Sequence, residues 1–301
     1  MTKRKTRGLY HGYLIIDKPA GMTSHDVVGR VRRVLGERRV GHAGTLDPAA
    51  VGVLPIAVGL ATRTVEYLSE ASKAYVAEIT FGITTDSADM DGTVTGIQDP
   101  SGLSRERVEE IVRSFAGSQM QVPPMHSAIK IDGRRMYELA RRGEEIDLPA
   151  RPITIHEIEL LGWESPVAEV YVHCSKGTYI RSLARDMGAR AGVGAFMSNL
   201  VRVMTGPFTL EDAIRLDDLE ALLEREPWEQ IAVHPDASLM DRQAIILGAD
   251  AAASWRNGNP VEVAGVEGVA RVYDGTGDWL GIGQAIEGES LLRPAKVVLE
   301  S

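Results

Sequence analysis

Apolar residues in the first two thirds of the chain follow two different spacings. Short continuous apolar runs bounded by turn residues are typical of buried strands, and they occur at residues 13–17, 53–58, 75–83, 153–161 and 169–174. Apolar residues three and four positions apart predict amphipathic helices, with Thr23 or Ser24 and Ser104 as N-caps, over 23–35, 64–69, 104–115 and 180–187. The two patterns together predict an α+β body.

The pattern changes after about residue 235. A helical stretch over 242–254 leads into strand-like runs, which Gly-rich turns separate, around Val261, Val269, Leu280 and Val297. This predicts a small β-rich domain at 235–301, appended to a body that spans 1–234.

Residues 121–152 interrupt the regular pattern of the body. The segment contains Pro123-Pro124 and several arginines, with helical spacing only near 136–141. We therefore expect an irregular insert that carries one short helix.

Composition narrows the class of protein. Of 301 residues, 44% are hydrophobic and 25% are charged, which is ordinary globular usage and permits a sizeable core. No apolar run reaches the length that a membrane span needs. The single cysteine, Cys174, excludes an internal disulfide and a Cys-rich zinc site. We expect a soluble cytoplasmic protein.

The net charge of −9 argues against a nucleic-acid partner, but the charges are unevenly distributed. Residues 1–70 carry 11 basic and 6 acidic side chains, whereas residues 207–301 carry 7 and 18. Because the acidity is concentrated in the tail, the charge of the whole chain does not exclude nucleic-acid binding by the body.

The segment Gly41–Pro48 (Gly-His-Ala-Gly-Thr-Leu-Asp-Pro) is the most informative part of the sequence. Its two glycines permit backbone conformations that are closed to other residues, and Pro48 favours an extended backbone at Asp47. The carboxylate of Asp47 would then project from a rigid turn. An ordinary surface turn fits the same residues, because glycine and Asp-Pro are common turn formers.

A second segment, Lys176–Arg181, places an arginine at the start of a predicted helix. A partly buried arginine requires a carboxylate partner, because an unpaired buried charge is costly. A solvated arginine on the helix surface is the alternative. Tyr75 begins a predicted strand, where a tyrosine commonly fills the core.

Three other patterns lack the residues that their chemistry needs. Ser127–Lys130 matches Ser-x-x-Lys of penicillin-binding enzymes without the companion motifs. Asp89–Gly92 resembles part of a calcium loop, but the first and last ligand positions do not fit. The histidines never adopt the His-Glu-x-x-His spacing. We expect no bound metal.

Five separated segments together resemble one known family. They are Asp17–Ser24, Gly41–Pro48, Lys73–Tyr75, Pro123–Lys130 and Gly177–Arg181. Their residues, order and spacing are similar to those of the TruB family, the bacterial tRNA pseudouridine-55 synthases. The resemblance implies the pseudouridine-synthase fold, with a mixed, largely antiparallel central sheet and flanking helices, followed by a PUA-like RNA-binding domain.

The resemblance also implies a reaction. The base of uridine 55 in the T-loop of tRNA is flipped out, detached from C1′, turned and reattached through C5, without a cofactor. Asp47 would be the catalytic aspartate, and attack at C1′, addition to the base and removal of the 2′ proton all stay open as its role. A carboxylate suits the step because cleavage of a glycosidic bond builds positive charge on the sugar. Arg181 would pair with Asp47 and keep it ionised.

Other RNA contacts follow from the same resemblance. Tyr75 would stack on the target base, Tyr179 and Leu200 would line the uracil pocket, and His42 would support the flipped loop. The insert corresponds to the family's mobile thumb, and four of its arginines suit phosphate contacts, namely Arg134, Arg135, Arg141 and Arg142. His126 and Val201 depart from the residues usual in the family. The expected partner is the T-arm of tRNA, and we expect a monomer without an obligatory protein partner.

Two rival functions fit parts of the same sequence. A guide-RNA-dependent pseudouridine synthase shares the segment around Asp47, but such enzymes assemble with protein partners and lack the long insert. A tRNA-folding chaperone, in which modification is secondary, is the alternative from another class.

Overall fold

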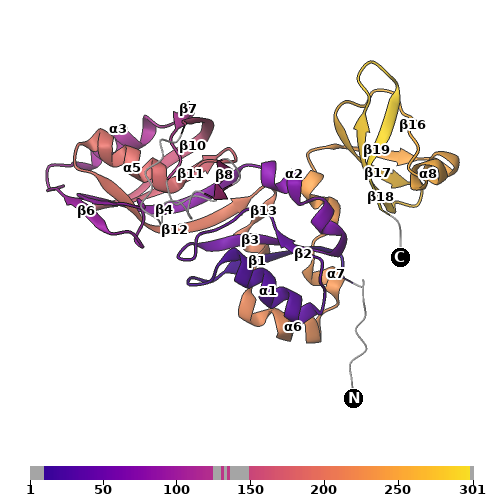
Figure 1. Ribbon diagram of the computed structural model, residues 1–301, viewed down its shortest axis with the longest axis horizontal. Coiled ribbons are helices and arrows are strands. Elements are labelled where there is room, and N and C mark those ends of the chain that lie inside the picture. Colours follow the sequence, from indigo (N-terminus) through magenta and orange to yellow (C-terminus); the bar gives the residue numbers. More distant parts are fainter. Residues whose placement is uncertain (1–9, 125–129, 132–133, 136–148, 299–301) are drawn as a thin grey trace.

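The body of the protein is built on one mixed sheet (Figure 1). The structure, a computed structural model, describes residues 10–124, 130–131, 134–135 and 149–298. In spatial order the strands of the main path are β14 (Ile214–Arg215), β1 (Gly12–Lys18), β3 (Val51–Val58), β12 (Ala195–Thr205), β4 (Lys73–Phe81), β11 (Val167–Cys174), β10 (Arg151–Glu164) and β7 (Gly117–Gln121). Two short strands pair at its side, β2 (Val40–His42) with β3 and β13 (Phe208–Thr209) with β12. The β1–β14 and β3–β12 pairs are parallel and the others are antiparallel, which confirms the predicted mixed, largely antiparallel sheet.

Strand β12 joins the two halves of this sheet. It lies between β3 and β4 and pairs with both of them. No strand is predicted over 195–205 from the sequence, because register shifts after Met197 and after Arg202 break the alternation by which a strand is recognised.

Helices cover the two faces of the sheet from different parts of the chain. Because alternate residues of a strand point to opposite faces, Leu14 and Ile16 of β1 belong to one core and Tyr13 and Ile15 to another. The main core contains α1 (Ser24–Leu35), α3 (Arg105–Arg113) and α5 (Ile180–Ala191); the smaller one contains η1 (Gly59–Arg63) and α2 (Val65–Glu70). The structure confirms the predicted helix starts, since Thr23 forms a capping box on α1 and Ser104 caps α3. The other elements up to residue 239 are β5 (Ile83–Thr85), β6 (Val94–Ile97), η2 (Leu210–Asp212), η3 (Leu216–Asp218), α6 (Leu219–Arg225), α7 (Trp228–Ile231) and η4 (Pro235–Leu239).

The predicted insert begins and ends on neighbouring strands. Gln121, the last residue of β7, pairs with Arg151, the first residue of β10. Between them β8 (Lys130–Ile131) and β9 (Arg134–Arg135) form a small antiparallel pair. The helix expected over 136–141 lies outside the described residues.

The C-terminal region forms a second sheet with its own core. Its elements are β15 (Gln243–Leu247), α8 (Ala249–Arg256), β16 (Val261–Glu262), β17 (Val269–Asp274), β18 (Trp279–Ala285) and β19 (Leu291–Val297), and the strand order is β15-β17-β18-β19-β16. The helix predicted over 242–254 is wrong in its first half, because Ile245 and Leu247 are buried while Ile246 between them is exposed, the alternation of a strand. The predicted β-rich character is confirmed, and the boundary at residue 235 stays a prediction.

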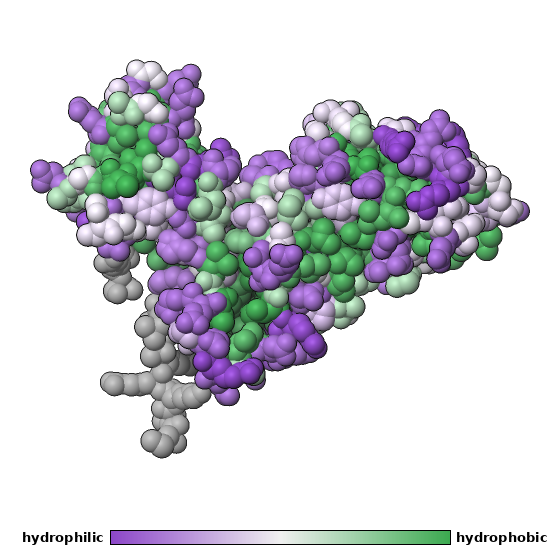
Figure 2. Space-filling view, turned by 180° about the vertical axis from the view of Figure 1, so that it is seen from behind, coloured by the Kyte–Doolittle hydropathy of each residue, from purple (hydrophilic) through white to green (hydrophobic). Residues whose placement is uncertain are grey.

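Polar and aromatic contacts join this C-terminal lobe to the preceding part of the chain, among them Arg271 with Asp236 and the ring of Trp279 with that of His234. Figure 2 shows it as a separate lobe with a concave notch between it and the body. Arg63 donates a hydrogen bond to the carbonyl of Val297 at 2.5 Å, and Lys296 forms an ion pair with Glu66 of α2 at 2.5 Å. No helix in the described part of the chain combines the length and the apolar character required to cross a membrane.

Candidate active site

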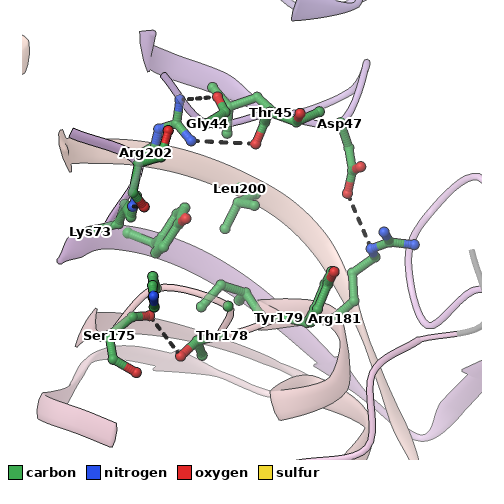
Figure 3. A pocket seen from close by; sticks show the side chains of 16 residues that line it. Gly44, Thr45, Asp47, Lys73, Ser175, Thr178, Tyr179, Arg181, Leu200 and Arg202 are labelled. Atoms are coloured by element: carbon green, nitrogen blue, oxygen red, sulfur yellow. Dashed lines mark hydrogen bonds and ion pairs between the residues drawn. The ribbon is translucent and has the colours of Figure 1, made fainter. Parts of the chain in front are cut away.

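A cavity of about 310 Å³ lies where β4, β12 and the start of α5 meet the loop between β2 and β3. Figure 3 shows its side chains converging from these elements. The cavity brings together five of the residues named from the sequence, Asp47, Tyr75, Tyr179, Arg181 and Leu200. Segments separated by more than a hundred residues therefore contribute to one site.

The loop that carries Asp47 is held by buried side chains. Lys18 is fully buried, and its ammonium group donates to the carbonyl oxygens of Met22 at 2.6 Å and Pro48 at 3.1 Å. The hydroxyl of Ser24 accepts a hydrogen bond from the backbone N–H of Leu46 at 2.9 Å. Because these contacts lie on both sides of Asp47, its carboxylate projects from a fixed backbone.

Arg202 supports the same loop from the other side of the cavity. Its buried guanidinium donates to the carbonyl oxygens of Gly44 at 3.1 Å and Thr45 at 3.4 Å (Figure 3). It also donates to the carbonyl oxygen of Val53 at 2.7 Å. Sequence reasoning did not identify this role. The signal in the sequence is an arginine within a mostly apolar strand, which would indicate a buried charge. It could not be used, because β12 was not predicted as a strand.

Arg181 lies between two carboxylates. Its Nε atom is 3.1 Å from Oδ2 of Asp47, and its Nη1 atom is 3.2 Å from Oδ2 of Asp89. The side chain of Arg181 is 7% exposed, that of Asp89 16% and that of Asp47 42%. Arg181 is thus fixed by Asp89 on the inner side, while Asp47 faces the cavity. Asp89 was missed, because from the sequence it belongs to an incomplete calcium loop.

The surroundings of Asp47 oppose its ionisation. Burial raises the pKa of this carboxyl above its usual value of 3.8, the positive charge of Arg181 lowers it, and the negative charges of Asp89 and Asp91 raise it further. A reaction that needs the carboxylate therefore loses rate as the pH falls through a pKa above that of an exposed aspartate.

Replacing Asp89 separates its effect on the pKa of Asp47 from its effect on the position of Arg181. In Asp89→Asn the pKa of Asp47 falls, because a neighbouring negative charge is removed, so the acid limb of the kcat–pH profile moves to lower pH. At neutral pH, kcat falls about 10-fold or more, because Arg181 loses the carboxylate that holds its Nη1 atom. The matched control is Asp91→Asn, which moves the acid limb in the same direction without loosening Arg181. Identical profiles for the two variants would refute a positioning role for Asp89.

The end of the cavity away from Asp47 is basic. The ammonium group of Lys73 donates to the carbonyl oxygens of Ser69 and Ala71, both at 2.6 Å. Burial, reinforced by the charge of Arg202, lowers the pKa of Lys73 to about 8. Burial raises the pKa of Tyr75, against the opposing charge of Arg202, so the phenol stays protonated at neutral pH. The cavity thus has a neutral aromatic ring between an acidic rim and a basic floor.

The root of the insert is bonded to the start of α5. The side-chain amide of Gln121 accepts from the backbone N–H of Tyr179 at 2.8 Å and donates to its carbonyl at 3.1 Å. Ser182 donates to the carbonyl of Val122 at 2.8 Å. Hydrogen bonds therefore join the first residues of the insert to the turn that carries Arg181.

Of the other residues named from the sequence, His42 does not line the cavity. His42 is on β2 with its ring 5.4 Å from that of His25, and burial lowers its pKa, so it is neutral at pH 7. Arg134 and Arg135 form β9. Arg141 and Arg142 are outside the described residues.

Three protein-family models match consecutive parts of the chain. Residues 32–180 match the family described as TruB family pseudouridylate synthase (N terminal domain). Residues 181–247 match the tRNA pseudouridylate synthase B C-terminal domain, and residues 244–298 match pseudouridine synthase II TruB, C-terminal.

Named relatives align over most of the chain. A Trichormus variabilis protein named tRNA pseudouridine synthase B is 42% identical over 91% of this chain and 94% of its own length. A protein of the same name from Symbiobacterium thermophilum is 47% identical over 82% of each chain.

Solved structures agree with the same assignment. A chain from an H/ACA RNP bound to a substrate RNA containing 2′-deoxyuridine matches with a TM-score of 0.74 and 25% identity, over 97% of this chain and 86% of that one. A chain from a Cbf5-Nop10-Gar1 complex has the same TM-score and 26% identity, over 98% and 85%. The predicted pseudouridine-synthase fold is thereby confirmed. The chain belongs to an enzyme family, the TruB pseudouridylate synthases.

Proposed function

We propose that this protein converts uridine 55 in the T-loop of tRNA to pseudouridine. The observation that carries the proposal is the placement of Asp47 at the rim of a cavity that Tyr75 and Leu200 also line. Relatives named tRNA pseudouridine synthase B, at 42–47% identity, support tRNA as the substrate.

The reaction moves the base from one of its atoms to another. The bond between C1′ of the ribose and N1 of uracil breaks, the base turns within the cavity, and a bond forms between C1′ and C5. C5 then loses its hydrogen as a proton and N1 gains one, so the product is an isomer of the substrate. The carboxylate of Asp47 stabilises or traps the positive charge that develops at C1′ when the first bond breaks.

The other lining residues bind the flipped base and orient Asp47. Tyr75 offers its ring face to the flipped base, and Tyr179 and Leu200 enclose it. Arg181 keeps Asp47 ionised in a site that burial makes unfavourable for charge. These roles need neither a metal ion nor an organic cofactor, because the charge at C1′ is met by a side chain.

Residues outside the cavity lining are proposed to contact the rest of the RNA. His42 supports the opened loop, and the insert with Arg134, Arg135, Arg141 and Arg142 contacts backbone phosphates. Residues 235–301 form a PUA-like domain that contributes little affinity, because the region is strongly acidic. The enzyme acts as a cytoplasmic monomer on the T-arm.

Two alternative functions differ from this proposal. One requires a guide RNA, and the other does not require Asp47. A guide-RNA-dependent enzyme is favoured only by the H/ACA neighbours at 25–26% identity, well below the identity to the tRNA relatives. A folding chaperone would need binding but not Asp47.

The test uses tRNA transcripts that carry 5-tritiated uridine. The purified protein is expected to release tritium from position 55 alone, because only a base rejoined through C5 loses its C5 hydrogen. A transcript with cytidine at position 55 is the control and should release none. If folded protein releases no tritium from bare tRNA, the stand-alone function is refuted, and the guide-dependent alternative is tested by adding guide RNA.

A further inference from the structure

Met90 is a long apolar side chain exposed beside the reaction site. It is 63% exposed and lies between Asp89, which pairs with Arg181, and Asp91, whose charge acts on Asp47. A small cavity of about 40 Å³ beside it is also lined by Asp47 and Leu200. Met90 therefore stands on the rim of the active site, on the far side of Asp47 from the cavity that would hold the base.

The loop that presents Met90 is held in place by its own hydrogen bonds. The backbone N–H of Met197 in β12 donates to the carbonyl of Ala88 at 3.0 Å, and the hydroxyl of Thr85 donates to that of Asp89 at 2.8 Å. Ala88 has φ of +59°, a conformation that non-glycine residues adopt only where the surroundings impose it. The exposure of Met90 is thus built into a well-braced loop and does not come from a loose segment.

The position of Met90 favours contact with a base over contact with a phosphate. If the target base occupies the cavity and its ribose lies at Asp47, the adjoining nucleotides must pass along the rim. Two carboxylates flank Met90, and negative charges repel a phosphate. An apolar, polarisable thioether packs well on the face of an unstacked base.

We propose that Met90 binds the nucleobase adjacent to the flipped uridine by packing against its face. The ligand class is an unstacked RNA base next to the target nucleotide. This inference rests on the proposed function, and it adds a substrate contact that the reaction chemistry does not require.

The test measures binding of T-arm hairpins in the Asp47→Asn background, where no turnover occurs. Adding Met90→Ala is expected to weaken binding about 2- to 10-fold, the range of a methionine–aromatic contact. Met90→Leu, which keeps an apolar side chain, should bind nearly as the parent does. The matched control is Met240→Ala, because Met240 is similarly exposed, at 59%, but lies outside the active-site cavity.

A hairpin with an abasic nucleotide on either side of the target identifies the contacted base. When that base is absent, Met90→Ala should cost no further affinity, because the two changes remove the same contact. The proposal is overturned if Met90→Ala binds like Met240→Ala, or if its loss persists with both abasic hairpins. Tritium release by the wild-type protein is a separate readout, so failure of the proposed function is distinguishable from failure of this inference.

Discussion

Asp47→Asn is expected to abolish tritium release from uridine 55, with a fall of about 10³-fold or more in the single-turnover rate. The amide has nearly the shape of the carboxylate but no negative charge, so it neither stabilises nor traps the cation that develops at C1′. Binding of the T-arm hairpin should be retained or improved, because the variant removes a negative charge from an RNA-binding rim.

The same variant separates modification from chaperone activity. Refolding of misfolded tRNA, measured by recovery of aminoacylation, should survive in Asp47→Asn if the protein has that activity. Tritium release within 10-fold of the wild-type rate would show that Asp47 is not the catalytic group.

Arg181→Met should lower kcat by about 10²- to 10³-fold, because the carboxylate of Asp47 loses the group that orients it. The charge of Arg181 partly offsets the burial that raises the pKa of Asp47, so its removal raises that pKa further and moves the acid limb of the profile to higher pH. Arg181→Lys should recover only part of the rate. A lysine ammonium is a compact charge, whereas the guanidinium spans from Asp47 to Asp89.

The pH profile distinguishes this role from a structural one. A variant that is merely unstable loses activity in proportion to the unfolded fraction, which circular dichroism at the assay temperature measures directly. A well-folded Arg181→Met protein with an unshifted acid limb would contradict the proposed effect on Asp47.

Local elements of this protein could be predicted because short-range chemistry decides them. The capping box at Thr23 and the apolar spacing of α1 lie within a dozen residues of each other. By contrast, β12 was missed and β15 was mistaken for helix. In both, the burial pattern depends on partner strands that are distant in sequence.

In the site, too, features that depend on neighbouring residues could be predicted, and contacts between distant residues could not. Asp47, Tyr75 and Arg181 stand in recognisable segments, but only the resemblance to a family joined residue 47 to residue 181. Asp89 and Arg202 were not assigned a role, because their partners are distant in the sequence. Asp89 pairs with Arg181. Arg202 donates to the backbone carbonyl of Gly44, more than a hundred positions away. Spacing along a chain carries no signal for such contacts.

The position of β12 between β3 and β4 also determines when this enzyme can become active during its own synthesis. Strands β3 and β4 are complete once residue 81 has been made, yet in the sheet they are joined through residues 195–205 (Figure 1). Asp47 belongs to the half that contains β3, and Arg181 belongs to the half that contains β4 and β11. Such long-range pairing is slow, because a large chain loop must close first. About two thirds of the chain must therefore be synthesised before the sheet can bring Asp47 and Arg181 together, because β12 is the strand that joins their two halves.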